Sequence, residues 1–146
     1  MMNDLMEWLF RSEHRYYMLE SVARANHAGR PSSQKDVMRH ASRPYWAASH
    51  KSNGSQACRD LVKAGLLLDV GKGKAKLQVN WWLVLLLPEH KYRLKNSEKH
   101  TTLAQLVHLT DTRKKQLLAQ PDAEAKMEEA RMALALNRFL DSCKGE

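Results

Sequence analysis

A chain of 146 residues with 43% hydrophobic composition is long enough for one globular core and short for two. Two cysteines cannot form a disulfide framework and no secretory signal precedes the first amphipathic segment, so we expect a reduced, cytoplasmic compartment. The longest apolar run, Trp81–Leu87, falls short of the roughly 20 residues that span a bilayer, which argues against a membrane protein.

The location of the positive charge points to a polyanionic partner. From residue 31 to residue 100 the chain has 13 Lys and Arg against five Asp and Glu, whereas the two signs balance on either side of this region. A localised positive field of this kind suits a polyanion better than it suits general solubility.

Apolar residues recur at helical spacing from Asn3 to about His27, which predicts one long first helix. Asn3 is a plausible N-cap, and Gly29 followed by Pro31 is a plausible stop. We expect this helix to supply core and part of a dimer interface. Its apolar face contains Leu5, Leu9, Tyr16, Leu19, Val22 and Ala23.

A short second helix is predicted to begin at Ser32 or Ser33, which can cap it, and to run through Ala41. The following segment, Ser42–Lys51, is longer than the turn of about three or four residues that joins the two helices of a helix-turn-helix. It mixes cations with aromatic residues, which suits a loop that contacts a nucleic-acid backbone. Trp46 within it is equally well explained as a core residue.

A third helix is predicted from a cap at Ser52 or Asn53 to Gly65. Cys58 and Leu61 fall three residues apart on its apolar face. The opposite face has the hydroxyl, amide and guanidinium groups that reach bases and phosphates in a major groove. Considered alone, this face is better explained as the solvated side of an ordinary amphipathic helix, so the prediction depends on the segment after Gly65. The polar face contains Ser55, Gln56, Arg59 and Lys63.

The chain after Gly65 predicts a basic β-hairpin. An apolar strand begins at Leu66, a tight turn comes next at Gly71–Lys74, and the returning strand alternates Leu77 and Val79 with polar residues. This alternation buries one face and leaves the lysines outside, where they can meet phosphates.

These elements together resemble a known class of regulator. Residues 32–80, about a third of the chain, resemble a winged helix of the broad MarR/ArsR type, through the Ser-capped helix, the small-polar start of the third helix, the Leu61-x-x-x-Gly65-Leu66-Leu67 exit and the Gly/Lys hairpin. The resemblance implies a helix-turn-helix with a hairpin wing that binds double-stranded DNA. It therefore predicts a mainly α-helical fold in which residues 1–100 form the DNA-binding domain.

The C-terminal part predicts further helices. Asn80 either caps a short helix through Leu87 or the run continues the strand, and a polar, basic link extends from Glu89 to Lys99. A helical pattern spans Leu103 to Leu118, and a last helix begins near Pro121.

The last helix has apolar residues on two sides, which are hard to bury in a small monomer. Residues 101–146 are therefore predicted to be a dimerisation extension that pairs with the first helix in a homodimer. Packing back on the same chain is the alternative. The predicted interface residues are Leu5, Leu9, Leu134, Leu136, Phe139 and Leu140.

No catalytic or cofactor-binding pattern is recognisable. The spacing around Gly71 and Gly73 does not match a phosphate-binding P-loop, and no nucleophile–base–acid spacing occurs. Seven histidines include no His-x-x-x-His pair, so no zinc site is encoded locally, although a site assembled across a dimer remains an alternative. We expect no enzyme activity, no cofactor and no resident metal.

Three functions are compatible with these patterns. The first is sequence-specific binding of double-stranded DNA by a homodimeric, nucleoid-associated repressor or autoregulator, with Gln56 and Arg59 reading bases. The second is an adaptor for plasmid or phage partition or replication, which coats repeated sites and recruits another protein through its C-terminal helices. The third is a protein–protein module that no longer touches DNA. The predicted DNA contacts are Arg43, Tyr45, Lys51, Ser52, Asn53, Ser55, Gln56, Arg59, Lys63, Lys72, Lys74 and Lys76.

Overall fold

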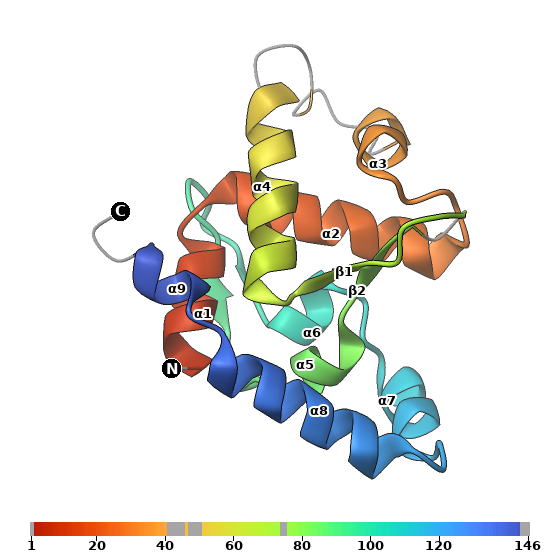
Figure 1. Ribbon diagram of the computed structural model, residues 1–146. Coiled ribbons are helices and arrows are strands. Elements are labelled where there is room, and N and C mark those ends of the chain that lie inside the picture. The colour runs from red at the N-terminus through yellow and green to blue at the C-terminus, as the bar shows by residue number, and fades with distance from the viewer. Residues whose placement is uncertain (1, 41–45, 47–50, 74–75, 144–146) are drawn as a thin grey trace.

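The computed structural model describes residues 2–40, 46, 51–73 and 76–143. The described chain is mainly helical and contains a small antiparallel hairpin, as the sequence predicts (Figure 1). Within these ranges, none of the helices combines the length and the apolar character that a membrane crossing requires.

The N-terminal apolar segment forms two helices, α1 (Met2–Phe10) and α2 (Glu13–Ala28), so the prediction of one long helix was wrong. Ser12 takes extended backbone angles, φ −124° and ψ 118°, and α2 begins after it. The buried Arg15 side chain crosses the break: its guanidinium donates to the Trp8 carbonyl at 2.8 Å and lies 4.2 Å from the Trp8 ring centre. The break lets both helices bury their apolar faces in one core, including Leu5, Leu9, Tyr16, Leu19, Val22 and Ala23.

The predicted stop and cap at the end of this segment are confirmed. Gly29 ends α2 in the left-handed region, at φ 66°, and its N–H reaches the last turn of the helix. The next helix, α3 (Gln34–His40), begins after Ser33, whose hydroxyl accepts a hydrogen bond from the Asp36 N–H at 3.1 Å.

Helix α4 (Lys51–Ala64) begins before Ser52 and Asn53, so the prediction that one of them is its N-cap was wrong. Its buried face, which includes Cys58 and Leu61, packs across α2 in the most extensive contact between two elements of the described chain. Gly54 permits a close approach to α3 and to the buried Trp46, since a Cβ at this position would lie 2.7 Å from Met38 Cε and 3.0 Å from the Trp46 ring.

The predicted hairpin is confirmed as an antiparallel pair, β1 (Leu67–Asp69) and β2 (Leu77–Val79), in which Leu68 lies opposite Gln78. Gly65, at φ 89°, turns the chain from α4 toward it. We call residues 67–79 the first hairpin.

The other edge of β2 is closed by side chains and backbone from the end of α2 and the segment after it. The Asn26 amide donates to the Leu77 carbonyl at 2.9 Å and accepts from the Val79 N–H at 3.0 Å. The Ser32 hydroxyl donates to the same Leu77 carbonyl at 2.7 Å, and the Leu77 N–H donates to the Ser32 carbonyl at 3.2 Å. The Leu77 N–H, the Leu77 carbonyl and the Val79 N–H on this edge of β2 are therefore all hydrogen-bonded.

The run after Asn80 is a helix, α5 (Trp81–Leu86), which settles the alternative left open by periodicity. The Asn80 side chain accepts from the Leu83 N–H at 3.4 Å and donates to the Gly65 carbonyl at 2.9 Å. One side chain therefore caps α5 and ties it to the exit of α4.

The segment predicted to be a basic link, residues 89–99, is instead largely a second hairpin. Its strands are β3 (Tyr92–Arg93) and β4 (His100–Thr101), which pair antiparallel with Tyr92 opposite Thr101. We call residues 91–101 the second hairpin.

Four helices complete the described chain: α6 (Leu103–Leu106), α7 (Asp111–Leu118), α8 (Ala123–Leu136) and α9 (Phe139–Ser142). The predicted helix over 103–118 is interrupted because His108 takes a positive φ of 56° and Thr110 caps α7. The last helix starts where predicted but stops at Leu136, and Asn137 donates to the Lys63 carbonyl at 2.9 Å.

The C-terminal helices share the core of the preceding residues. Helix α8 packs on α5 with Ala130 and Leu134 buried, and it runs along the bottom of the molecule in Figure 1. Phe139 and Leu140 are half-buried, and the Phe139 ring meets the Trp8 ring edge-on at 5.6 Å between centroids. Packing back on the same chain therefore accounts for one side of this region.

The placement of two predicted dimer residues was wrong. Leu5 and Leu9 are each 0% exposed inside the chain's own core, so neither has surface to offer a partner. Leu134 is also buried, whereas Leu136 is 72% exposed. Of the predicted interface residues, Leu136, Phe139 and Leu140 retain accessible surface.

Candidate nucleic-acid interface

The face of α4 that points away from α2 is polar and exposed, and it contains Asn53, Gln56, Arg59 and Lys63. The Arg59 guanidinium donates to the Gln56 side-chain oxygen at 2.9 Å, and the Gln56 amide donates to Asp60 Oδ1 at 2.8 Å. These bonds orient the Gln56 amide with its oxygen toward a cation. Since all three side chains meet solvent, the bonds can be exchanged for bonds to a ligand at small cost.

Two hollows lie beside this face, where α3, α4 and β2 meet. The larger, about 790 Å³, is lined by residues of α3 together with Trp46, Ser55 and Lys76. The smaller, about 310 Å³, lies between α4 and the first hairpin and includes Cys58 and Asp69 in its wall. Gln34 lines both, and its side-chain amide donates to the Ser55 hydroxyl, which joins α3 to α4.

The walls of these hollows are strongly basic. Asp69 is the single carboxylate among the described residues that line them, and it is engaged by the Gly71 N–H at 2.8 Å. The field over this face is therefore positive, which favours an anionic ligand. The cations in the walls are Lys35, Arg39, Arg59, Lys63 and Lys76.

The tip of the first hairpin presents Lys72 to solvent. Gly71 and Gly73 on either side take φ angles of 87° and 93°. Residues that have a Cβ rarely adopt this left-handed backbone conformation. Hydrogen bonds from Val70 N–H to the Lys76 carbonyl, at 2.8 Å, and from Lys72 N–H to the Val70 carbonyl, at 3.0 Å, hold the turn. The two glycines therefore allow the tight turn that exposes Lys72.

Cys58 belongs to the packing of this site and not to its chemistry. The side chain is buried, and burial raises the pKa of its thiol; nearby Asp69 raises the pKa further, while Arg59 and Lys76 oppose the shift. A thiol with a raised pKa is protonated at neutral pH and is a poor nucleophile. It acts here as a small apolar residue under α4.

The structure brings together most of the predicted contacts that it describes. Ser55, Gln56, Arg59, Lys63 and Lys76 lie around α4 and the two hollows. Asn53 is exposed on the same helix, and Lys72 is at the hairpin tip. Arg43, Tyr45 and Lys74 lie outside the described residues, and Lys51 and Ser52 are described only as backbone in the first turn of α4.

Sequence analysis missed the contribution of α3. Lys35 and Arg39 lie four residues apart, one helical turn, and both line the larger hollow with Gln34. That spacing on a predicted helix was the available signal.

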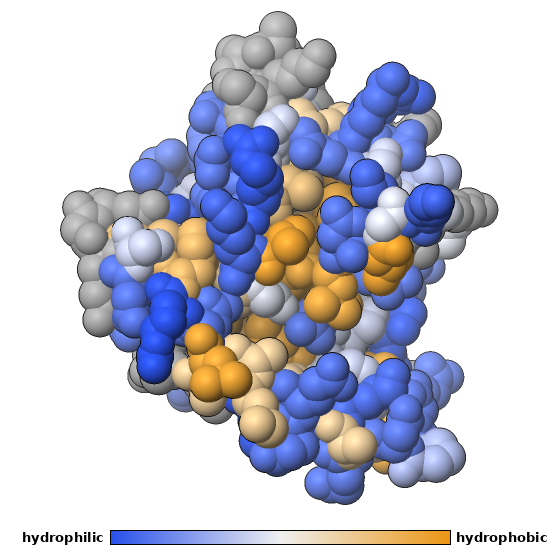
Figure 2. All heavy atoms as spheres, in the orientation of Figure 1, coloured by the Kyte–Doolittle hydropathy of each residue, from blue (hydrophilic) through white to orange (hydrophobic). Residues whose placement is uncertain are grey.

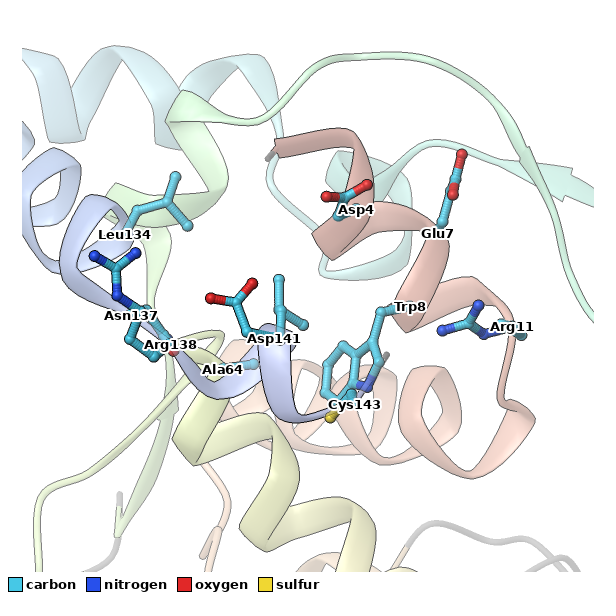
Figure 3. Close-up of a pocket in the computed structure, with 11 residues that line it drawn as sticks. Asp4, Glu7, Trp8, Arg11, Ala64, Leu134, Asn137, Arg138, Asp141 and Cys143 are labelled. Carbon is cyan, nitrogen blue, oxygen red and sulfur yellow. The ribbon is translucent and has the colours of Figure 1, made fainter. Parts of the chain in front are cut away.

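Another hollow, of about 330 Å³, lies between α1 and the C-terminal segment (Figure 3). Asp4 and Glu7 of α1 line it together with Arg11, which follows α1, and Arg138 and Asp141 line it from the other side. Because the two signs of charge are mixed in its wall, it lacks the net positive field of the face around α4.

Figure 2 shows hydrophilic side chains along α4, with apolar side chains between α4 and the first hairpin and again near the C-terminal end of α8. The large exposed apolar residues on these elements are Leu68 and Val70 on the hairpin and Met132 and Leu136 on α8.

Over the part of the chain that the structure describes, no three His, Cys, Asp or Glu side chains are grouped so that they could hold a metal ion.

Comparisons of this chain with protein-family models, with curated proteins and with solved structures found no match. A functional assignment therefore depends on the chemistry of the residues themselves. The strongest chemical feature is the basic face formed by α3, α4 and the first hairpin.

Proposed function

We propose that this protein binds double-stranded DNA with α4 in the major groove and the first hairpin against the phosphate backbone, as a homodimeric transcriptional repressor or autoregulator. The observation that supports this most strongly is the set of five cations, opposed by one carboxylate, in the hollows beside the exposed polar face of α4. Phosphate contacts supply most of the sequence-independent affinity for DNA, and they need this kind of concentrated positive field.

The order of elements adds support. The chain forms α2, α3 and α4 and then the first hairpin. This is the order expected from the resemblance to a winged helix-turn-helix. The bonds from Asn26 and Ser32 to β2 hold the hairpin beside α4. A hairpin fixed in this way can contact phosphates next to the groove that the helix enters.

Base recognition is assigned to Arg59 and Gln56. A guanidinium can bond two acceptors of guanine in the major groove, and an amide can bond the paired donor and acceptor of adenine. In the free protein both groups are bonded to each other, and Gln56 is also bonded to Asp60. Binding would exchange these solvent-exposed bonds for bonds to base edges.

The direct test selects bound fragments from genomic DNA at moderate salt and then compares variants on the selected site. Arg59→Ala should cost about 1–3 kcal/mol and relax discrimination at one base pair. Arg131→Ala, which removes an exposed arginine from α8, is the matched control and should bind as the native protein does. Failure of the native protein to retain any fragment would refute the proposed function.

Exposed apolar side chains on the C-terminal helices support the homodimer. Leu118 on α7 is 55% exposed, and Met132 and Leu136 on α8 are 56% and 72% exposed. Pairing with a second copy would remove this surface from water. A two-fold dimer would then space its two α4 helices for half-sites about one DNA turn apart.

The same surface favours the alternative, an adaptor for plasmid or phage partition or replication. In that case the apolar residues of α7 and α8 would dock a second protein while the basic face coats repeated sites. Footprint length separates the two functions, because one palindrome covers about two helical turns whereas a coated array extends over many.

A further inference from the structure

The second hairpin is a second concentration of positive charge, apart from the face around α4. Lys91, Arg93, Lys95 and Lys99 are all exposed on it. The carboxylate of Glu98 in the same turn lies 3.7 Å from the Arg93 guanidinium, and the remaining charge is basic. Exposed cations by themselves are common on solvated surfaces. Whether these four can bind a ligand together depends on how rigidly the hairpin holds them.

The turn of the second hairpin is held in one conformation by its own hydrogen bonds. Leu94 N–H donates to the Lys99 carbonyl at 3.0 Å, and Arg93 Nε donates to the Ser97 carbonyl at 3.0 Å. Asn96 takes a left-handed φ of 61°, a conformation that asparagine tolerates better than most residues. The cations are therefore presented from a defined turn.

The hairpin is also attached firmly to the N-terminal helices. The Tyr16 hydroxyl donates to the Lys95 carbonyl at 2.8 Å, and burial of this tyrosine raises its pKa, which keeps the donor protonated. The Tyr92 ring stacks on Phe10, with 5.0 Å between centroids and 7° between planes. Lys95 is thus held over the first turns of α2.

The two hairpins are attached to opposite ends of α2. Tyr16 binds the second hairpin and Asn26 binds the first, and these residues are about 15 Å apart along the helix axis at about 1.5 Å per residue. In Figure 1 helix α4 crosses in front of α2, with the first hairpin on its right and the paler, more distant green-to-teal segment that contains the second hairpin on its left. Seen from this direction, a basic hairpin lies on each side of α4.

We propose that the second hairpin is a second phosphate-binding element, which contacts the DNA backbone on the side of the groove opposite to the first hairpin. The proposal rests on the proposed function, since it requires α4 to enter the major groove. That groove is about 12 Å wide and has a phosphate backbone along each side. Cations held on both sides of the helix can therefore meet both backbones of one duplex.

The test measures affinity for a duplex of about 30 base pairs over a series of salt concentrations. The triple variant Lys91→Gln, Lys95→Gln and Lys99→Gln removes three charges whose side chains take no part in the turn bonds described above. The matched control is Lys115→Gln, Lys126→Gln and Arg131→Gln, which removes the same charge from exposed and half-exposed positions on α7 and α8. Circular dichroism checks that both variants are folded.

For the second-hairpin variant we expect affinity to fall on the order of tenfold or more at moderate salt. We also expect the slope of log affinity against log salt to decrease by about 0.9 for each phosphate that the variant no longer binds. The control should keep the native slope, and hydroxyl-radical footprinting should show reduced protection of one backbone only for the hairpin variant.

The outcomes are separable. If the native protein binds DNA and the two triple variants have equal slopes and footprints, the second hairpin is not a phosphate-binding element, while the proposed function stands. If the native protein binds no DNA, both proposals fail.

Discussion

The first hairpin is part of the hydrophobic core, whereas the second hairpin is attached to its surface. In the first, Leu67, Leu77 and Val79 are buried, and the edge of β2 is closed by Asn26 and Ser32. In the second, no residue of β3 or β4 is buried. It is attached by the ring stack of Tyr92 on Phe10, by hydrogen bonds that join Tyr16 to the Lys95 carbonyl and Asn96 to Glu13, and by the partly buried Leu94. Both carry exposed cations.

The first hairpin therefore contributes to the stability of the fold as well as exposing cations, whereas the second mainly exposes cations. Burial of alternate side chains specifies the register of the first hairpin, since a slip by one residue would expose Leu77 and Val79. The register of the second hairpin is set by local bonds and by a few contacts to α1 and α2. Changes in the first should therefore affect the whole fold, while changes in the second should stay local.

The largest expected effect is that of Leu77→Ala. This side chain is 3% exposed, so its truncation removes core packing and leaves a cavity, and we expect the free energy of unfolding to fall by about 2–5 kcal/mol. Urea denaturation followed by circular dichroism measures the change. Arg93→Ala in the second hairpin is the counterpart and should change stability by less than about 0.5 kcal/mol. Equal costs for the two variants would break the comparison.

Asn26→Ala should have the next largest effect. It removes the partner of the Val79 N–H and one of the partners of the Leu77 carbonyl, and an unsatisfied buried group costs about 1–3 kcal/mol. The same denaturation experiment measures this loss. Asn96→Gly, which keeps the left-handed turn of the second hairpin, serves as the control, and a cost as large as that of Asn26→Ala would contradict the contrast.

Tyr16→Phe tests how the second hairpin is held. Loss of the hydrogen bond to the Lys95 carbonyl should cost about 0.5–1.5 kcal/mol. Amide hydrogen exchange should become faster at Leu94, whose N–H bonds across the second hairpin, and should stay unchanged at Val70 in the first. Faster exchange at both amides would show that the hairpins are coupled.

The smallest expected effect is a pH dependence of stability. It arises at the C-terminal end of α2, the end to which the first hairpin is attached. His27, next to Asn26, stacks on His108 at 5.7 Å between centroids. Burial lowers the pKa of His108, and His27 and Arg24 lower it further. A histidine with a lowered folded pKa stabilises the fold above its unfolded pKa, about 6.5, and this stability is lost as pH falls through the lower folded value.

We therefore expect the urea midpoint to fall between about pH 7.5 and about pH 5.5, and to fall less in His108→Asn, since asparagine also tolerates the positive φ at this position. Parallel pH profiles for the native and variant proteins would rule out His108 as the source of the dependence.

The two hairpins also differ in how well sequence predicts them. Alternation around Leu77 and the glycines of the first turn produced the correct strands, because burial on one face leaves a period-two pattern. The second hairpin has strands of two residues and no buried side chain in them, so it leaves no such pattern, and residues 89–99 were predicted to be a link. Likewise, the cap at Ser33 and the stop at Gly29 were predictable because each depends on the chemistry of one residue.

Breaks within a helical pattern were not predictable in the same way. The apolar spacing continues through Ser12 and through residues 107–110. The first break is visible only in the packing of α1 and α2 around Arg15, and the second only in the positive φ of His108. The predicted dimer role of Leu5 and Leu9 was wrong for a related reason. Periodicity identifies an apolar face, but it does not say whether that face meets its own chain or a partner.

The sequence by itself determined the mainly helical fold, the first hairpin and the concentration of charge between residues 31 and 100, because local capping, side-chain period and composition depend only on neighbours along the chain. The tertiary structure decided which cations share a surface. It placed Lys35 and Arg39 of α3 in the wall of one hollow and Arg59 of α4 in the wall of the adjoining one, and it attached a basic hairpin to each end of α2. These are contacts between residues far apart in sequence, which only the packing of the helices brings together.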